Sequence, residues 1–210
     1  MDVARFKKLP VLGILRGIKQ DGVAPLVEAV IASGLQTLEI TMNTPDAALR
    51  IKEAVAIAGK RLTIGAGTVL SLASLKTALA AGATFIVMPT LVPEVAGFCR
   101  KRKIPFFPGA LTPQEIYLAW QAGATMVKVF PAGFFGPSYF KEIKGPFNDV
   151  ELLACAGVTA QNMKEYFACG ASAVSFGASV FKQEWLAQGD FGSISTCVSK
   201  FILEARTVFR

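Results

Sequence analysis

The stretch "AGATMVKV" (residues 122–129) decides the fold, because it joins a glycine to an apolar strand and this junction recurs along the chain. The related stretches are "SGLQTLEI" (33–40), "AGATFIVM" (81–88) and "CGASAVSF" (169–176). In all four, the glycine suits the left-handed conformation that ends a helix, and a strand follows it. The glycines are Gly34, Gly82, Gly123 and Gly170. Their spacing is roughly two strand–helix units, which predicts a chain of alternating helices and strands.

Eight short apolar runs are predicted to be strands, and amphipathic segments such as 21–32 and 112–122 lie between most of them. The runs are 11–16, 35–41, 62–68, 84–89, 104–109, 125–130, 151–157 and 173–177. Helix starts are expected at Asp21, Thr44-Pro45 and Thr112-Pro113. Strands joined by crossover helices indicate an α/β protein, a single-domain (β/α)8 TIM barrel over residues 1–210. A doubly wound open sheet is the structural alternative.

The composition favours a folded protein, and its positive charge suits an anionic partner. Apolar residues make up 52% of the chain, which argues against disorder. The net charge of +7 permits nucleic acid as a partner, but it also suits a small anionic substrate. Basic residues are scattered except in "CRKRK" (99–103), which is expected at a helix C-terminus, where cations are favoured.

The cysteines indicate where the protein is located, and the absence of histidine limits which side chains can act in catalysis. The four cysteines lack CxxC spacing and no signal peptide is visible, which predicts a reduced, cytoplasmic protein. The longest uncharged stretch, residues 77–93, is too short and too interrupted by glycine and proline to span a membrane. Because the chain has no histidine, no metal site is expected, and acid–base work falls to carboxylate, lysine, tyrosine, cysteine or water.

Charged residues interrupt two of the apolar runs. Glu39 and Lys128 are expected to point into the barrel, because side chains alternate along a strand and the outward face packs against helices. The same alternation groups Ile14 with Arg16, and Ala66 with Thr68.

The four polar residues named above fall toward the C-terminal ends of their strands, where TIM-barrel active sites are built. Arg16, Glu39, Thr68 and Lys128 are therefore predicted to meet in one cavity. The alternative is a buried ion-pair network without function, although such networks rarely repay the cost of removing charges from water.

The residue types suit carbonyl chemistry. Burial disfavours the ammonium form of Lys128, and the neutral amine is a nucleophile that forms Schiff bases with carbonyl compounds. Glu39 could then move protons next to the iminium. Arg16 can hold a carboxylate, and Thr68 can add a hydroxyl hydrogen bond.

Glycine-containing turns follow the last two predicted strands. They are "CAGV" (155–158) and "FGAS" (176–179). Barrels often bind phosphate at this place through loop N–H groups, so a phosphate site is expected here.

The chain resembles the 2-keto-3-deoxy-6-phosphogluconate (KDPG) / 4-hydroxy-2-oxoglutarate (KHG) aldolases, over nearly its whole length. The resemblance rests on "LPVLGILRGI" (9–18), "LEITMNTP" (38–45), "IGAGTVL" (64–70), "IPFFPGALTPQE" (104–115), "VKVFPAGFFGPSYFKEIKGPF" (127–147) and "AGVT" (156–159). It implies a cytoplasmic, homotrimeric class I aldolase of the Entner–Doudoroff type. Such an enzyme needs no cofactor and makes pyruvate plus an aldehyde such as glyceraldehyde 3-phosphate.

The resemblance also implies roles for individual residues. The Schiff-base lysine of the family falls on Lys128 and its general acid/base on Glu39. The contacts to the pyruvate carboxylate fall on Thr68 and, in the branch with "LRG", on Arg16. The remaining substrate-binding positions fall on Pro89, Gly157, Gly177 and Ser179.

The chain departs from the family pattern at several places. Many members have an arginine four residues after the glutamate, where this chain has Asn43. Cys155 and Ala156 replace a threonine and a glycine, and Met88 stands where serine is frequent. "LRG" with Asn43 is similar to the branch that cleaves 2-keto-3-deoxy-6-phosphogalactonate, which is the alternative substrate.

Two further functions compete with an aldolase. A barrel isomerase or epimerase for phosphosugars, without covalent chemistry, more often uses histidine, carboxylate pairs or a metal. A non-enzymatic protein that binds anions or nucleic acid would show a basic stripe with aromatic residues, and the sequence has none. We therefore expect a small keto-acid substrate and neither nucleic acid nor membrane as a partner.

Overall fold

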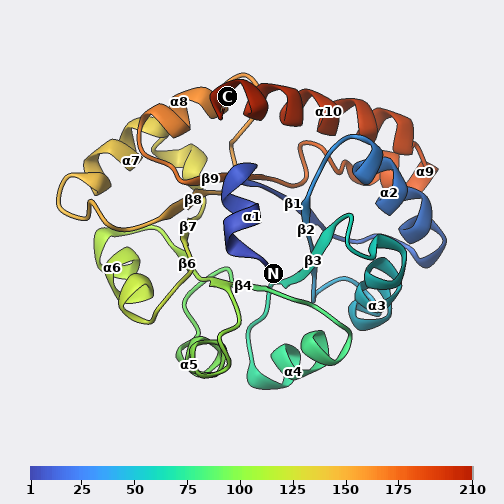
Figure 1. Ribbon diagram of the computed structural model, residues 1–210, viewed down its shortest axis with the longest axis horizontal. Helices are drawn as coiled ribbons and strands as arrows, with labels where there is room; N and C mark the ends of the chain where they lie inside the picture. Colours follow the sequence, from blue (N-terminus) through green and yellow to red (C-terminus); the bar gives the residue numbers. More distant parts are fainter. Residues whose placement is uncertain (210) are drawn as a thin grey trace.

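The computed structural model describes residues 1–209, and its strands form a parallel ring surrounded by helices (Figure 1). The strands are β1 Val11–Leu15, β2 Thr37–Thr41, β3 Thr63–Gly67, β4 Ile86–Val87, β5 Phe106–Phe107, β6 Gly109–Ala110, β7 Val127–Val129, β8 Leu152–Ala154 and β9 Ala173–Phe176. The helices are α1 Val3–Lys8, α2 Gln20–Ala32, α3 Ala47–Ala58, α4 Leu72–Ala80, α5 Pro93–Arg102, α6 Pro113–Gln121, α7 Pro137–Lys144, α8 Met163–Ala168, α9 Gln183–Gln188 and α10 Phe191–Val208, with the 3-10 turn η1 Ala132–Phe134. The predicted alternation of strands and helices is confirmed.

The sheet order β5-β4-β3-β2-β1-β9-β8-β7-β6 describes a closed barrel. Its two ends, β5 and β6, are separated in the chain only by Pro108, so they are two halves of one barrel strand. β5 pairs with β4, β6 pairs with β7, and the backbone N–H of Lys128 donates to the Pro108 carbonyl at 2.8 Å. The nine segments are therefore the eight predicted strands, and the doubly wound sheet is excluded.

The helix-to-strand junctions follow the predicted glycine pattern. Gly34, Gly82, Gly123 and Gly170 have φ values of 84°, 98°, 91° and 100°. This left-handed conformation is easy for glycine and costly for a residue with a Cβ, so the expected helix ends are confirmed.

The predicted helix starts hold in one case and shift in two. Thr112 caps α6 in a full capping box with Glu115, as expected. Asp21 lies inside the first turn of α2, and Lys19 is the N-cap. The helix expected at Thr44-Pro45 begins only at Ala47, because Asp46 directly before it has a left-handed backbone with φ 53°, which a right-handed helix cannot include.

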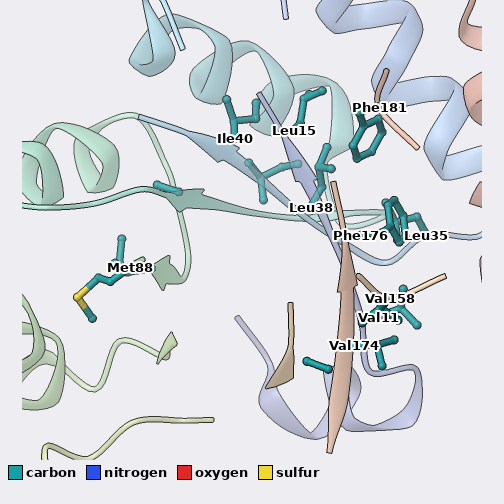
Figure 2. Packing of buried hydrophobic residues seen from close by; sticks show 14 of the residues in the cluster. Val11, Leu15, Leu35, Leu38, Ile40, Met88, Val158, Val174, Phe176 and Phe181 are labelled. Carbon is teal, nitrogen blue, oxygen red and sulfur yellow. The ribbon is translucent and has the colours of Figure 1, made fainter. Parts of the chain in front are cut away.

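Two apolar layers line the two faces of the barrel wall. The larger, outer cluster lies between strands and helices, and Figure 2 shows part of it, including Leu15, Leu38 and Ile40. The inner cluster fills the N-terminal half of the barrel with Phe6, Leu12, Phe85, Val87, Phe107, Met126, Leu153 and Ala173. Phe6 comes from α1, which lies across the ring in Figure 1, and its side chain packs edge-on against Phe107 at 5.9 Å between ring centroids. The inner cluster thus closes one end of the barrel and forms an apolar floor beneath the residues near the other end.

No helix within residues 1–209 is both long enough and apolar enough to cross a membrane.

Candidate active site

A cavity of about 580 Å³ opens at the C-terminal ends of the strands. All eight predicted site residues line it: Arg16, Glu39, Thr68, Pro89, Lys128, Gly157, Gly177 and Ser179. The predicted meeting of these residues in one place is therefore seen in the structure, and the individual roles given to them stay predictions.

Lys128 lies in the middle of β7 and is buried, with 7% of its surface exposed. Its neighbours Val127 and Val129 belong to the outer cluster, so the lysine points into the barrel, as the alternation along the strand predicts. The Nζ atom lies 5.3 Å from the centroid of the Phe130 ring. An amine held against an aromatic face, at the edge of a cavity, is accessible to a small ligand and shielded from bulk water.

Glu39 lies on β2 and is only 1% exposed. Its Oε2 atom is buried and has no hydrogen-bond partner within the described residues. Burial raises the pKa of this carboxyl from 4.5 to about 7, and the positive charges of Lys128 and Arg16 limit the rise. A carboxyl with a pKa close to neutrality can both accept and return a proton, which is what a general acid/base requires.

The three charged residues of the cavity are not paired with one another. None of the ion pairs within 4.0 Å among residues 1–209 includes Arg16, Glu39 or Lys128. A buried network that served only stability would place opposite charges in contact, because unpaired buried charges are costly. The ion-pair alternative is therefore wrong for this part of the chain, and the charges face the cavity instead.

The Glu39 carboxylate occupies space that is open because Gly67 has no side chain. A Cβ atom on Gly67 would lie 2.1 Å from Oε1 of Glu39 and 2.6 Å from its Cδ. Both distances are far shorter than a van der Waals contact. The Glu39 carboxylate, at the far end of its side chain, would therefore have to move.

The Gly67→Ala variant is expected to displace this carboxylate and to lower kcat for carbonyl chemistry by up to about 10²-fold, because small misplacements of a reacting group carry large rate penalties. The control is Gly97→Ala in α5, where a new Cβ meets no atom within 4 Å. We expect the control to keep full activity and to gain about 0.5–1 kcal/mol in unfolding free energy. Steady-state kinetics and urea unfolding test both variants, and a fully active Gly67→Ala protein would contradict this placement.

The raised pKa of Glu39 predicts a pH dependence of stability. Between pH 4.5 and about 7, the folded state holds the Glu39 proton while the unfolded state has lost it. The free energy of unfolding therefore falls as pH rises through this window, by on the order of 3 kcal/mol from this group. Urea unfolding of wild type and Glu39→Gln at about pH 5 and about pH 8 measures the effect.

In that experiment the stability of Glu39→Gln relative to wild type should increase with pH. Carboxyls with lowered pKa values, such as Glu115 and Asp190, contribute equally to both proteins and cancel in the difference. A difference that is the same at both pH values would mean that Glu39 ionises normally in the folded state.

Thr68 lines the cavity, but the alternation of side chains along β3 does not explain its orientation. Ala66 belongs to the outer cluster, and the inward positions of β3 are Gly65 and Gly67. The expectation that Ala66 and Thr68 share the inward face is therefore wrong. Thr68 follows the end of β3 with φ 57°, and this left-handed backbone breaks the alternation and turns its side chain into the cavity.

The turns after β8 and β9 form another part of the cavity wall. Gly157 has φ 87°, and a Cβ there would lie 2.6 Å from the Cα of Gly133, so two glycine-containing loops touch here. The backbone N–H groups of Gly157, Ala178 and Ser179 donate no hydrogen bond within residues 1–209. Free backbone donors grouped at a loop suit an anion such as phosphate.

Several cavity residues were not predicted as site residues. They include Ile14, Phe130, Cys155, Ser175 and Gln183. Strand alternation could have found Cys155 and Ser175, which stand two residues after Leu153 and Ala173 of the inner cluster. Burial raises the pKa of the Cys155 thiol, against the opposing influence of Lys128, so this thiol is neutral at pH 7. Gln183 lies beyond the last strand and carries no sequence signal for this position.

The family model and the two relatives described here are all aldolases. A family model described as "KDPG and KHG aldolase" matches residues 3–197. A probable 2-dehydro-3-deoxy-6-phosphogalactonate aldolase from Rhizobium meliloti is 35% identical over 174 residues, 82% of this chain and 82% of that protein. A 2-dehydro-3-deoxy-phosphogluconate aldolase from Pseudomonas aeruginosa is 35% identical over 161 residues, 76% of this chain and 71% of that protein.

One similar solved structure contains a covalent reaction intermediate. The KDPG aldolase from Legionella pneumophila, with pyruvate captured at low pH as a covalent carbinolamine intermediate, has a TM-score of 0.85 to this chain at 27% identity. The match covers 93% of this chain and 95% of that protein.

Proposed function

The chain belongs to the KDPG and KHG aldolase family, and from that premise we propose that it is a class I aldolase acting through Lys128. Its substrate is 2-keto-3-deoxy-6-phosphogluconate or 4-hydroxy-2-oxoglutarate, and its products are pyruvate and an aldehyde such as glyceraldehyde 3-phosphate. The observation that carries the proposal is a buried lysine without a carboxylate partner, in one cavity with a buried, unpaired glutamate.

The reaction begins when the amine of Lys128 attacks the keto carbon C2 of the substrate. The carbinolamine loses water to give an iminium, which can accept an electron pair from the neighbouring carbon. Glu39 takes the proton of the C4 hydroxyl as the C3–C4 bond breaks, the aldehyde leaves and the lysine retains an enamine. Glu39 then returns the proton to C3, and water hydrolyses the resulting iminium to release pyruvate and the free amine.

The remaining site residues bind the two ends of the substrate. Arg16 and Thr68 hold the carboxylate next to the keto group, because a guanidinium forms charge-assisted hydrogen bonds and a hydroxyl adds another. Pro89 contributes to the wall around this end. The free N–H groups of Gly157, Ala178 and Ser179, in turns that also contain Gly177, support phosphate binding at the other end.

A second candidate substrate is 2-keto-3-deoxy-6-phosphogalactonate. Two observations favour it: Arg16 lines the cavity, and Asn43 stands where many family members have arginine. The relative from Rhizobium meliloti described above carries the name of this activity.

One kinetic experiment separates the substrates and tests the function. Values of kcat/KM are measured for the phosphogluconate-derived acid, its phosphogalactonate-derived C4 epimer and unphosphorylated 4-hydroxy-2-oxoglutarate, with pyruvate as the product detected. We expect the phosphorylated acids to be preferred, and the better of the two gives the C4 specificity. Absence of pyruvate formation from all three would overturn the proposed function.

Activity should be independent of metal ions. The iminium serves as the electron sink, and without histidine the chain lacks the commonest metal-ligating side chain. We expect full turnover after exhaustive chelation, measured on protein whose metal content is checked by mass spectrometry. A loss of activity that added divalent ions restore would show that the reaction uses a metal.

The proposal extends to assembly and setting. A homotrimer, a cytoplasmic location and a step of the Entner–Doudoroff type follow from the family resemblance. Light scattering during size-exclusion chromatography tests the trimer directly.

A further inference from the structure

The peptide bond between Arg16 and Gly17 is held from both sides. The Arg16 carbonyl accepts a hydrogen bond from Nε2 of Gln183 at 3.0 Å. The Gly17 N–H donates to Oγ1 of Thr44 at 3.0 Å. Gln183 begins α9, after the last strand, whereas Thr44 lies in the connection after β2. Two connections that are distant in sequence therefore fix one peptide unit at the mouth of the cavity.

Thr44 ties this peptide unit to the strand that carries Glu39. Thr44 is 4% exposed, and its Oγ1 lies 3.2 Å from Oγ1 of Thr41. Thr41 stands two residues after Glu39 on β2 and is also buried. The chain of contacts thus runs from the Arg16–Gly17 peptide through two hydroxyls to the backbone of the glutamate strand.

Gly17 is required for the geometry. Its φ of 75° is in the left-handed region, and a Cβ there would lie 3.1 Å from Oε1 of Gln183. The glycine lets the chain turn after β1 while the peptide faces Gln183 on one side and Thr44 on the other.

The side chain of Arg16, in contrast, has no fixed partner within residues 1–209. Its guanidinium makes no ion pair with a carboxylate, and the hydrogen bonds at Arg16 involve only its carbonyl. The backbone is anchored, whereas the guanidinium belongs to an exposed residue that lines the cavity and is free to meet a ligand there. The anchored peptide then sets where that group can reach.

We propose that Thr44 and Gln183 are positioning residues that hold the Arg16–Gly17 peptide, so that the Arg16 guanidinium meets the substrate carboxylate. This inference rests on the proposed function, in which Arg16 binds that carboxylate. Gln183 lines the cavity and Thr44 does not, and in this proposal both residues act on the substrate through Arg16. Loss of either contact widens the range of positions that the guanidinium samples, which weakens carboxylate binding and leaves the chemistry at Lys128 intact.

The test removes each contact with and without Arg16. Thr44→Val removes the acceptor at nearly constant volume, and Gln183→Leu removes the donor. We expect each to raise KM by about two- to tenfold, in line with the net worth of one hydrogen bond, and to change kcat much less. Thr44→Ser should restore the wild-type KM. Gln188→Leu, on the same short helix but outside the cavity lining, is the matched control and should have no effect.

The Arg16→Ala background decides whether the effect passes through Arg16. In that background Thr44→Val and Gln183→Leu should no longer raise KM, because the group that they position is gone. Equal increases with and without Arg16 would overturn the proposal. So would the absence of any increase in either background.

A second measurement separates this inference from the proposed function. Hydrogen exchange of the Gly17 amide reports the contact to Thr44 without any substrate, and Thr44→Val should accelerate it. Borohydride trapping of pyruvate by the wild type reports the proposed function. Unchanged Gly17 exchange overturns the positioning role even if pyruvate is trapped. Failure to trap pyruvate overturns the aldolase mechanism, and with it the role given to Arg16.

Discussion

Lys128→Arg should abolish cleavage completely and should remove the borohydride-stable adduct with pyruvate. Arginine preserves a positive charge at this position in β7, so the electrostatic surroundings of Glu39 remain similar. A guanidinium does not give up its proton under physiological conditions and cannot form a Schiff base. Every step of the proposed mechanism depends on that covalent bond, and no partial activity is expected.

The measurement combines kinetics with mapping of the adduct. Wild type and variant are incubated with pyruvate, reduced, digested and examined by mass spectrometry. Lys141→Arg, an exposed lysine on the following helix α7, provides the control and should trap pyruvate on Lys128 as the wild type does. An adduct on a different lysine in the wild type would refute the assignment of the nucleophile.

The second large effect is expected for Glu39→Gln. The amide keeps the shape of the side chain and loses the ability to accept and return a proton. General acid–base groups contribute about 10²–10⁴-fold, so kcat should fall by a factor in that range. Because the amine of Lys128 is untouched, pyruvate should still be trapped there, although more slowly.

Exchange of the pyruvate methyl protons with deuterated water isolates the role of Glu39. This half-reaction needs the Schiff base and a base, and it needs no aldehyde. In wild type the exchange rate should change with pH around 7, where the Glu39 carboxyl titrates, and this inflection should disappear in the variant. If Glu39→Gln exchanges protons at the wild-type rate, Glu39 is structural and another base must act. Tyr139 is a poor replacement, since its hydroxyl already donates to the Leu111 carbonyl.

Regular features of the sequence predicted most of the fold. Glycines at four helix-to-strand junctions and apolar runs of strand length identified all eight barrel strands, because both signals are local. The fifth strand was predicted as continuous, yet Pro108 lacks an N–H and divides it into β5 and β6. The helix start expected at Thr44 is too early because Asp46 adopts a left-handed backbone, a conformation that the local sequence pattern does not predict.

The site residues also differ in how well a local sequence pattern predicts them, depending on whether they lie on a regular strand. Alternation along regular strands predicted that Glu39 and Lys128 point inward, and both line the cavity. It failed at Thr68, whose left-handed backbone lies just beyond β3, where the period of two no longer applies. Gln183 could not have been predicted, because its position depends on how the connection after β9 packs against the one after β1.

The order of strands in the ring also bears on when the site forms during synthesis. Every pair of neighbouring strands is consecutive along the chain except β1 and β9, which join its two distant parts. The hydrogen bond between Gln183 and Arg16 crosses this same seam and links residues 167 positions apart. Closing so long a loop is entropically costly, so the seam is expected to form late, after the local strand–helix units have assembled. A nascent chain that has already formed β2 with Glu39 and β7 with Lys128 still lacks a fixed Arg16, and the ability to bind a carboxylate should be acquired only when the C-terminal part of the protein emerges.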